Sequence, residues 1–175
     1  MELEANFKAI LAANTYSKTG NLNITDYYKV NASHCLSEYG VQFPYWTGVR
    51  SVWKPFEAWR VPANPVTPHV LPWYQAYNAA KHDRAAELPQ ANLENLLYAL
   101  AGLRVVLSAQ YLWHDFGPNI GIISYSDAGF MTGQGGYLGV KLPASIPLAE
   151  RYDFAWSTLA SSGTDPFEKF DYDQV

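Results

Sequence analysis

Apolar residues recur at helical spacing near the start of the chain and again before its middle. A first helix is expected over residues 2–14, where four apolar residues share one face at i, i+4, i+7 and i+8: Leu3, Phe7, Ile10 and Leu11. A second helix is expected over residues 72–84, because Pro72 suits the first helical position. Its apolar residues repeat at i, i+4 and i+7: Trp73, Tyr77 and Ala80. Both patterns predict helices that bury one side.

The most continuous apolar pattern predicts a long helix over residues 90–113. Its leucine-rich stripe is broad: Leu93, Leu96, Leu97, Leu100, Leu103, Leu107 and Tyr111. Alanine and valine side chains extend the apolar surface to most of the circumference, which is typical of a helix in the middle of a bundle or at a subunit interface. The link to helix 72–84 is short, so these two helices are expected to form an antiparallel pair. Helix 2–14 should pack against that pair.

Residues 21–71 show no sustained helical period. Five prolines lie between positions 55 and 72, and proline lacks an amide donor and favours extended backbone in its neighbour. The segment is also rich in aromatic residues: Tyr39, Phe43, Tyr45, Trp46, Trp53, Phe56 and Trp59. We expect an irregular insertion that wraps the core and covers it with lids, with short strands near residues 41–43 and 49–53.

The character of the chain changes again over residues 117–149. Five glycines fall within eleven positions, 129–139. Residues 120–125 and 137–142 could pair as a short hairpin around this glycine-rich turn.

The last stretch, residues 150–175, carries six acidic and two basic residues, whereas residues 27–84 carry six basic and three acidic ones. The acidic tail is therefore either solvated or docked on the basic middle of its own chain or of a partner. A short helix is also predicted to begin at Asp165-Pro166, a cap residue followed by proline.

These patterns predict a single domain, residues 1–175, of the mainly α (α+β) class: a helical bundle core with an irregular insertion and a minor β-hairpin. The length of 175 residues suits one domain. A content of 49% hydrophobic and 15% aromatic residues excludes a disordered chain, and a single cysteine excludes a disulfide scaffold. The net charge of -4 argues against a broadly basic nucleic-acid coat. Without a signal-peptide pattern or a long apolar span, a cytoplasmic protein with no membrane partner is expected.

Polar chemistry concentrates at the end of the expected helix over residues 72–84. Asn78 and His82 are four residues apart, so their side chains meet on a helix; Lys81 is close to both, and Arg84 ends the helix. An imidazole titrates near neutrality, and neighbouring cations lower its pKa and attract an anion. The pattern suits acid–base chemistry on a phosphodiester, or capture of a phosphate or carboxylate. His82, Asn78 and Arg84 are the candidate catalytic residues.

Three further residues are candidates for ligand binding: Lys81, Asn92 and Trp73. Asn92 lies near the start of the next helix, whose N-terminus favours anions, and an indole ring suits stacking on a base or sugar. A structural interpretation of the same residues stays open, in which His82 caps its helix, Asn78 bonds main-chain groups and Lys81 is solvated. No tight cluster of metal-ligating residues is present in the sequence, so neither a metal nor another cofactor is expected.

Residues 73–113 resemble the HEPN-like helical proteins and uncharacterised bacterial relatives. The resemblance rests on an Asn-x-x-Lys-His helix, Asn78 to His82, followed by the leucine-rich helix. It implies a helical, commonly dimeric protein with metal-independent ribonuclease activity and an RNA or nucleotide ligand. The family places an arginine a few residues before its catalytic histidine. Here Asn78 holds that place and the arginine follows, at Arg84.

Three functions are therefore open. The first is a HEPN-like protein that binds RNA, a nucleotide or another anion through the Asn78–His82–Arg84 face, with or without cleavage. The second is a non-enzymatic protein that forms homo-oligomers or binds a protein partner through the leucine-rich helix and the aromatic insertion. The third is a carbohydrate or small-ligand binder that uses exposed tryptophan rings.

Overall fold

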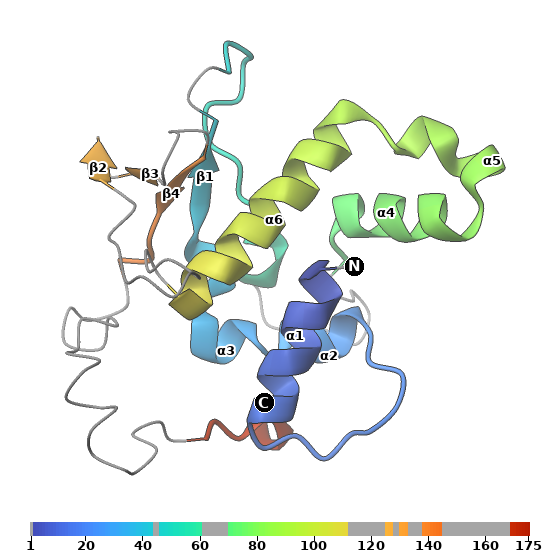
Figure 1. Cartoon of the computed structure of the whole chain (residues 1–175), viewed down its shortest axis with the longest axis vertical. Coiled ribbons are helices and arrows are strands. Elements are labelled where there is room, and N and C mark those ends of the chain that lie inside the picture. Colours follow the sequence, from blue (N-terminus) through green and yellow to red (C-terminus); the bar gives the residue numbers. More distant parts are fainter. Residues whose placement is uncertain are drawn as a thin grey trace, which may run out of the picture.

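The computed structural model describes residues 2–43, 46–60, 70–111, 125–127, 130–132, 138–144 and 169–175. Helices dominate this part of the chain, and four short strands form one small sheet (Figure 1). The α-helices are α1 (Glu2–Ala13), α2 (Ile24–Tyr28), α3 (Asn31–His34), α4 (Pro72–His82), α5 (Arg84–Glu87) and α6 (Leu93–Tyr111). The strands are β1 (Gly40–Gln42), β2 (Tyr125–Asp127), β3 (Phe130–Thr132) and β4 (Gly139–Lys141). The prediction of a mainly α fold with minor β structure is confirmed.

The three predicted helices are present, with shifted ends. α1 buries the face that the sequence predicted, Leu3, Phe7, Ile10 and Leu11. α4 stops two residues early because Asp83 leaves helical geometry and its carboxylate accepts the amide of Ala86, which begins α5. α6 begins three residues late because Asn92 caps it, and residues 112–113 lie outside the described chain.

α4 and α6 pack on each other and run in roughly opposite directions, and α1 also contacts α6 (Figure 1). The α4–α6 contact depends on Gly102, because a Cβ atom there would lie only 3.0 Å from Cη2 of Trp73. A glycine on α6 thus makes room for the largest ring on α4. The expected helix pair, with α1 against it, is confirmed.

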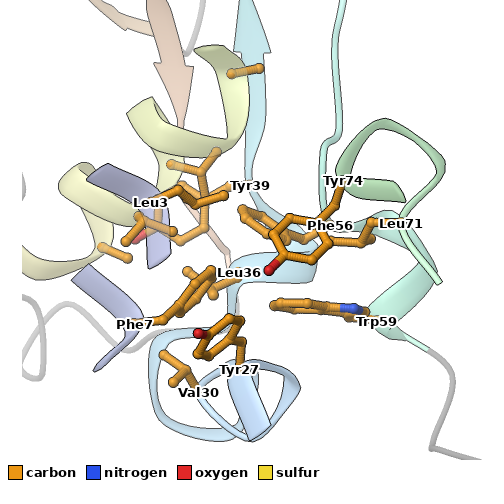
Figure 2. Close-up of a cluster of buried hydrophobic side chains, with 14 of the residues drawn as sticks. Leu3, Phe7, Tyr27, Val30, Leu36, Tyr39, Phe56, Trp59, Leu71 and Tyr74 are labelled. Carbon is orange, nitrogen blue, oxygen red and sulfur yellow. The ribbon is translucent and has the colours of Figure 1, made fainter. Parts of the chain in front are cut away.

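The segment predicted to wrap the core supplies much of it instead. Several rings from this segment lie inside, and Phe7 of α1 stacks on Tyr27 of α2 with ring centroids 5.1 Å apart (Figure 2). Phe56 and Trp59 complete the ring cluster, with centroids 4.7 Å apart. Burial of large aromatic surface stabilises the fold, which explains why an irregular segment holds its place. Residues 61–69, which hold three of the five prolines, lie outside the described chain.

The sheet has the order β1–β4–β3–β2, with every pair antiparallel. Val41 of β1 faces Val140 of β4, and Val41 also exchanges two main-chain hydrogen bonds of 2.8 Å with Trp53. The predicted strand near residues 137–142 exists as β4, but its partners are β1 and β3. A hairpin partner cannot be read from alternation alone, because such short strands carry little register information. Residues 120–124 lie outside the described chain.

The described end of the acidic tail, residues 169–175, docks on the N-terminal part of the same chain. Thr15 donates to the carbonyl of Phe170 at 3.0 Å and accepts from the amide of Tyr172 at 2.9 Å. Lys29 donates to the main-chain oxygen of Tyr172 at 2.8 Å, and the Tyr172 ring is fully buried. These residues therefore dock on their own chain, but largely on Thr15 and its surroundings; Lys29 is the contact within the basic middle, residues 27–84, that the charge pattern predicted. The helix predicted to begin at Asp165-Pro166 lies outside the described chain.

Candidate functional site

The predicted polar site lies at the C-terminal end of α4 and the start of α5. Asn78 is half-buried, whereas Lys81 and His82 are exposed on the last turn of α4. Asp83 separates the two helices, and Arg84 is the first residue of α5. The main-chain path therefore keeps the polar residues of the motif in one region of the surface.

Lys81 and Tyr74 of α4 converge on a carboxylate from another helix. Glu4 of α1 accepts a hydrogen bond from the Tyr74 hydroxyl at 3.0 Å, and Lys81 Nζ lies 3.9 Å from the second oxygen of the same carboxylate. Asn78, one turn further along the same helix, lies near the Tyr74 hydroxyl. The result is a small network that fastens α1 to α4.

The network changes the acidity of the phenols around Glu4. Burial raises the pKa of Tyr74 well above its ordinary value; the hydrogen bond from Asn78 lowers it, and the bond to Glu4 raises it. Burial, together with the charges of Glu4 and Asp26, raises the pKa of Tyr27 to about 12. Both phenols therefore stay protonated at neutral pH and act as hydrogen-bond donors rather than bases.

His82 does not join this network. It makes no hydrogen bond or ion pair with any residue that the structure describes, and its ring is exposed. The side chain of Arg84 lies outside the description. Of the predicted residues, Lys81 therefore lies beside Glu4, Asn78 lies near Tyr74, and His82 is on the solvent side.

The other two predicted ligand-binding residues have structural roles. Trp73 is buried in the core, where its indole N–H donates to the carbonyl of Pro55 at 2.8 Å. Asn92 accepts the amide of Asn95 at 2.9 Å through its side chain, which satisfies one of the free amides at the start of α6. No ring face of Trp73 is open to a ligand, and the Asn92 oxygen is occupied by the helix that it caps.

The sequence pattern did not reveal that the leucine stripe of α6 faces solvent. Leu93, Leu96 and Leu100 are 59%, 55% and 43% exposed. The opposite side of the helix, which includes Ala101, Val105 and Ala109, is buried against the core. At 100° per residue the leucines lie at the centre of the solvent side, where a helix of a globular protein normally carries polar residues. The 3–4 spacing of the leucines was visible in the sequence, but their orientation was not.

Five leucines of this stripe lie on the same side of α6, and we call them the leucine face: Leu93, Leu96, Leu100, Leu103 and Leu107. Leu103 and Leu107 are half-buried, and the half-buried side chain of Arg104 lies beside them. The Nε atom of Arg104 is buried and has no hydrogen-bond partner among the residues that the structure describes, and burial lowers the pKa of this guanidinium. Arg104 is the one charged residue beside the stripe, and Glu94 is the other charged residue of α6.

A second polar cluster surrounds Asp26 near the docked tail. The buried carboxylate of Asp26 receives hydrogen bonds from Lys18 at 2.7 Å, from the Tyr16 hydroxyl at 2.6 Å and from the amide of Asn23 at 2.7 Å. Burial raises the pKa of Asp26, but these donors outweigh it and hold the pKa below its ordinary value. Residues of this chain supply all of these donors to Asp26, so we interpret the cluster as a structural cap for α2.

Within the described ranges, no group of three or more His, Cys, Asp and Glu side chains is placed to hold a metal ion. The helices described there are also too short or too polar to cross a lipid bilayer. Searches of family models, curated proteins and solved structures find no match to this chain.

Proposed function

We propose that this protein self-associates, and that the leucine face of α6 is the contact surface. The observation that supports this proposal is the exposure of Leu93, Leu96 and Leu100 at the centre of the solvent side of the helix. Large apolar side chains gathered on one face mark an interaction site more often than isolated ones do.

The occupant that fits this face best is a second copy of the chain. The leucines recur at alternating spacings of three and four residues, the pattern by which one helix packs into the grooves of an identical one. No acidic residue interrupts the stripe, and Arg104 is its single charged neighbour, so two copies meet with little repulsion.

The size of the face predicts a weak contact. From Leu93 to Leu107 the helix rises about 21 Å, and a helix is about 10 Å wide, so the leucine face covers roughly 200 Å². A stable complex usually buries about 800 Å² on each partner. The leucines would therefore form the centre of a larger contact, and we expect association that depends on protein concentration.

Sedimentation velocity between about 10 µM and 1 mM tests this proposal. The wild-type chain should shift towards a dimer as concentration rises, and the double variant Leu96→Glu/Leu100→Glu should remain monomeric throughout. Val49→Glu is the matched control, because Val49 is a fully exposed apolar residue that does not belong to α6. That control should associate like the wild type.

Urea titration of each variant separates association from folding. Replacing two exposed leucines should change the free energy of unfolding by less than about 1 kcal/mol, because surface substitutions rarely do more. A wild-type chain that stays monomeric at 1 mM, or a stable double variant that associates as the wild type does, would contradict the proposal.

A second candidate function is capture of RNA or another anion at the α4–α5 junction. The observation that favours it is the exposure of Lys81 and His82 at consecutive positions, with Arg84 two residues further on. Exposed cations can neutralise phosphates without any pocket, and such binding weakens as salt concentration rises. The HEPN-like resemblance of residues 73–113 supports the same candidate.

Fluorescence anisotropy with a labelled single-stranded RNA oligonucleotide tests this second candidate. We expect micromolar binding at low salt that weakens at least fivefold in His82→Ala/Arg84→Ala. Lys8→Ala removes an exposed cation from α1 and should bind like the wild type. Equal RNA binding by the double variant and the wild type would exclude this role. Incubation of the RNA with EDTA shows separately whether binding is accompanied by metal-independent cleavage.

A further inference from the structure

A guanidinium group is enclosed between two aromatic rings at the outer end of the sheet. The Arg50 guanidinium carbon lies 5.1 Å from the ring centroid of Trp53 and 5.1 Å from that of Tyr98. The two rings are themselves 4.9 Å apart at an angle of 73°, so they form two walls of one corner. An aromatic face attracts a cation through its quadrupole, most strongly for tryptophan and arginine.

Hydrogen-bond acceptors complete the corner. Nη1 of Arg50 donates to Glu94 Oε1 at 3.1 Å and to the Tyr98 hydroxyl. One carboxylate, one phenol oxygen and two ring faces are the groups that recognise a planar, delocalised cation. We name Trp53, Tyr98 and Glu94 together the guanidinium box.

The walls of the box and its occupant differ in how firmly they are held. Trp53 is buried and its main chain exchanges two hydrogen bonds of 2.8 Å with Val41, while Tyr98 and Glu94 belong to α6. Arg50 belongs to an exposed loop, and the side chain of the preceding residue, Val49, is fully exposed. The box therefore keeps its shape on rigid elements, whereas the occupant is attached to a loop.

The box is also open to solvent. The side chains of Arg50 and Glu94 are 45% and 61% exposed, so a cation could reach the carboxylate from outside. From these observations we propose that the guanidinium box binds the guanidinium group of a ligand, and that Arg50 is the internal group with which this ligand competes. This site is independent of the leucine face and of the α4–α5 junction.

Replacing the internal occupant tests the site directly. Arg50→Met keeps an unbranched side chain but removes the cation, so the box is left empty. Ethylguanidinium is the probe, and ethylurea is the matched control because it has nearly the same shape without the charge. The NMR signal of the Trp53 indole N–H is the readout, because this ring is a wall of the box.

We expect ethylguanidinium to shift the Trp53 signal of Arg50→Met in a saturable way, with an affinity at least tenfold higher than for the wild type. Ethylurea should cause no saturable shift. Arg50→Met/Glu94→Gln should bind ethylguanidinium at least fivefold more weakly than Arg50→Met, because the carboxylate is lost. Equal responses to the two probes, or equal affinities of the wild type and Arg50→Met, would overturn the proposal.

Arg50→Lys is a second variant for the case in which Arg50→Met does not fold. A lysine is a poorer match to the planar box, so ethylguanidinium should displace it more easily than it displaces Arg50. The same titration with the peptide acetyl-Gly-Arg-Gly-amide identifies the source of the ligand. Tenfold tighter binding of the peptide indicates an arginine of a protein chain, and equal binding indicates a small guanidinium compound.

Discussion

The imidazole of His34 lies at the end of α3, beside the docked tail. Its Nδ1 is 2.8 Å from the Ser33 hydroxyl, which in turn is 2.6 Å from the hydroxyl of Tyr172. Burial lowers the pKa of His34 to about 4, so the ring is neutral when the protein is folded at pH 7. The environment of this one side chain therefore couples protonation to folding.

The free energy of unfolding should decrease as the pH falls through a range that is set by His34. In the unfolded chain a histidine titrates near pH 6.5, whereas in the folded chain it titrates near 4. The unfolded state therefore binds more protons between these values, and the free energy of unfolding decreases as the pH falls from 6.5 towards 4. In His34→Gln this decrease should be smaller. Urea titrations at pH 7.5 and 5.0 measure it.

His82→Gln is the control for that prediction, because His82 is exposed and lies outside the buried cluster. It should keep the pH dependence of the wild type. The prediction fails if His34→Gln loses as much stability between pH 7.5 and 5.0 as the wild type does.

Trp73 is expected to support the fold rather than to contact a ligand. Trp73→Phe removes the indole N–H that satisfies the buried carbonyl of Pro55 and leaves space beside Gly102. The cost should be about 2–3 kcal/mol in the free energy of unfolding. Trp46→Phe, at a largely exposed ring, should cost less than about 1 kcal/mol in the same urea titration. A Trp73→Phe variant as stable as the wild type would contradict this role.

The sequence located the polar site but could not show what its residues contact. Asn78, Lys81 and His82 were predicted on one helix, and they lie there. Glu4, the partner of Lys81, is more than seventy residues away in the chain, so no spacing within α4 could indicate that the two lie side by side. Exposure of His82 also depends on how α1 and α4 pack, which helical periodicity does not specify.

At the scale of elements, α6 combines two apolar faces on one helix. Small and β-branched side chains such as Ala101 and Val105 face the core, and leucines face the opposite side. The sequence predicted a helix that is apolar nearly all round, which is what the structure shows. It could not show which side solvent reaches, because leucine, valine and alanine are all compatible with burial. The packing of Gly102 against Trp73 fixes that orientation.

The start of α6 depends on a single cap. Asn92→Ala removes the oxygen that accepts the Asn95 amide, so it should lower the free energy of unfolding by about 1 kcal/mol. Asn92→Ser keeps a capping oxygen and should stay close to the wild type. Urea titration measures both. Unchanged stability in Asn92→Ala, together with weaker anion binding, would instead assign Asn92 to a ligand site.

At the scale of the whole molecule, the two described ends of the chain lie side by side. Residues 169–175 run next to the end of α1 and the following turn (Figure 1). Asp173 accepts hydrogen bonds from the amide and hydroxyl of Ser17, at 3.0 and 2.9 Å. The acidic composition suggested a docked tail as one possibility, but the contacts with Ser17 and Thr15 are mainly hydrogen bonds. Charge alone could not have identified them.

Tyr172 should hold this end of the chain in place. Tyr172→Ala removes a fully buried ring and should lower the free energy of unfolding by about 3–5 kcal/mol. Tyr172→Phe keeps the buried ring but loses the hydroxyl contact with Ser33, and should cost about 1 kcal/mol. Val175→Ala, at a half-exposed residue, is the control and should have little effect. Amide hydrogen exchange at Thr15 should become faster in Tyr172→Ala, and unchanged exchange would show that the tail does not protect this site.

The bridge between Thr15 and Asp171 also affects when the protein can finish folding. A ribosome adds roughly 5–20 residues per second, so about 8–30 s separate the synthesis of these two partners. During that interval the far end of α1, the buried site of Tyr172 and the ammonium group of Lys29 all lack their final neighbours. The N-terminal helix can form early, but its surroundings are completed only after residues 170–172 have been made. A chain stalled before residue 170 would therefore expose this region to chaperones and proteases.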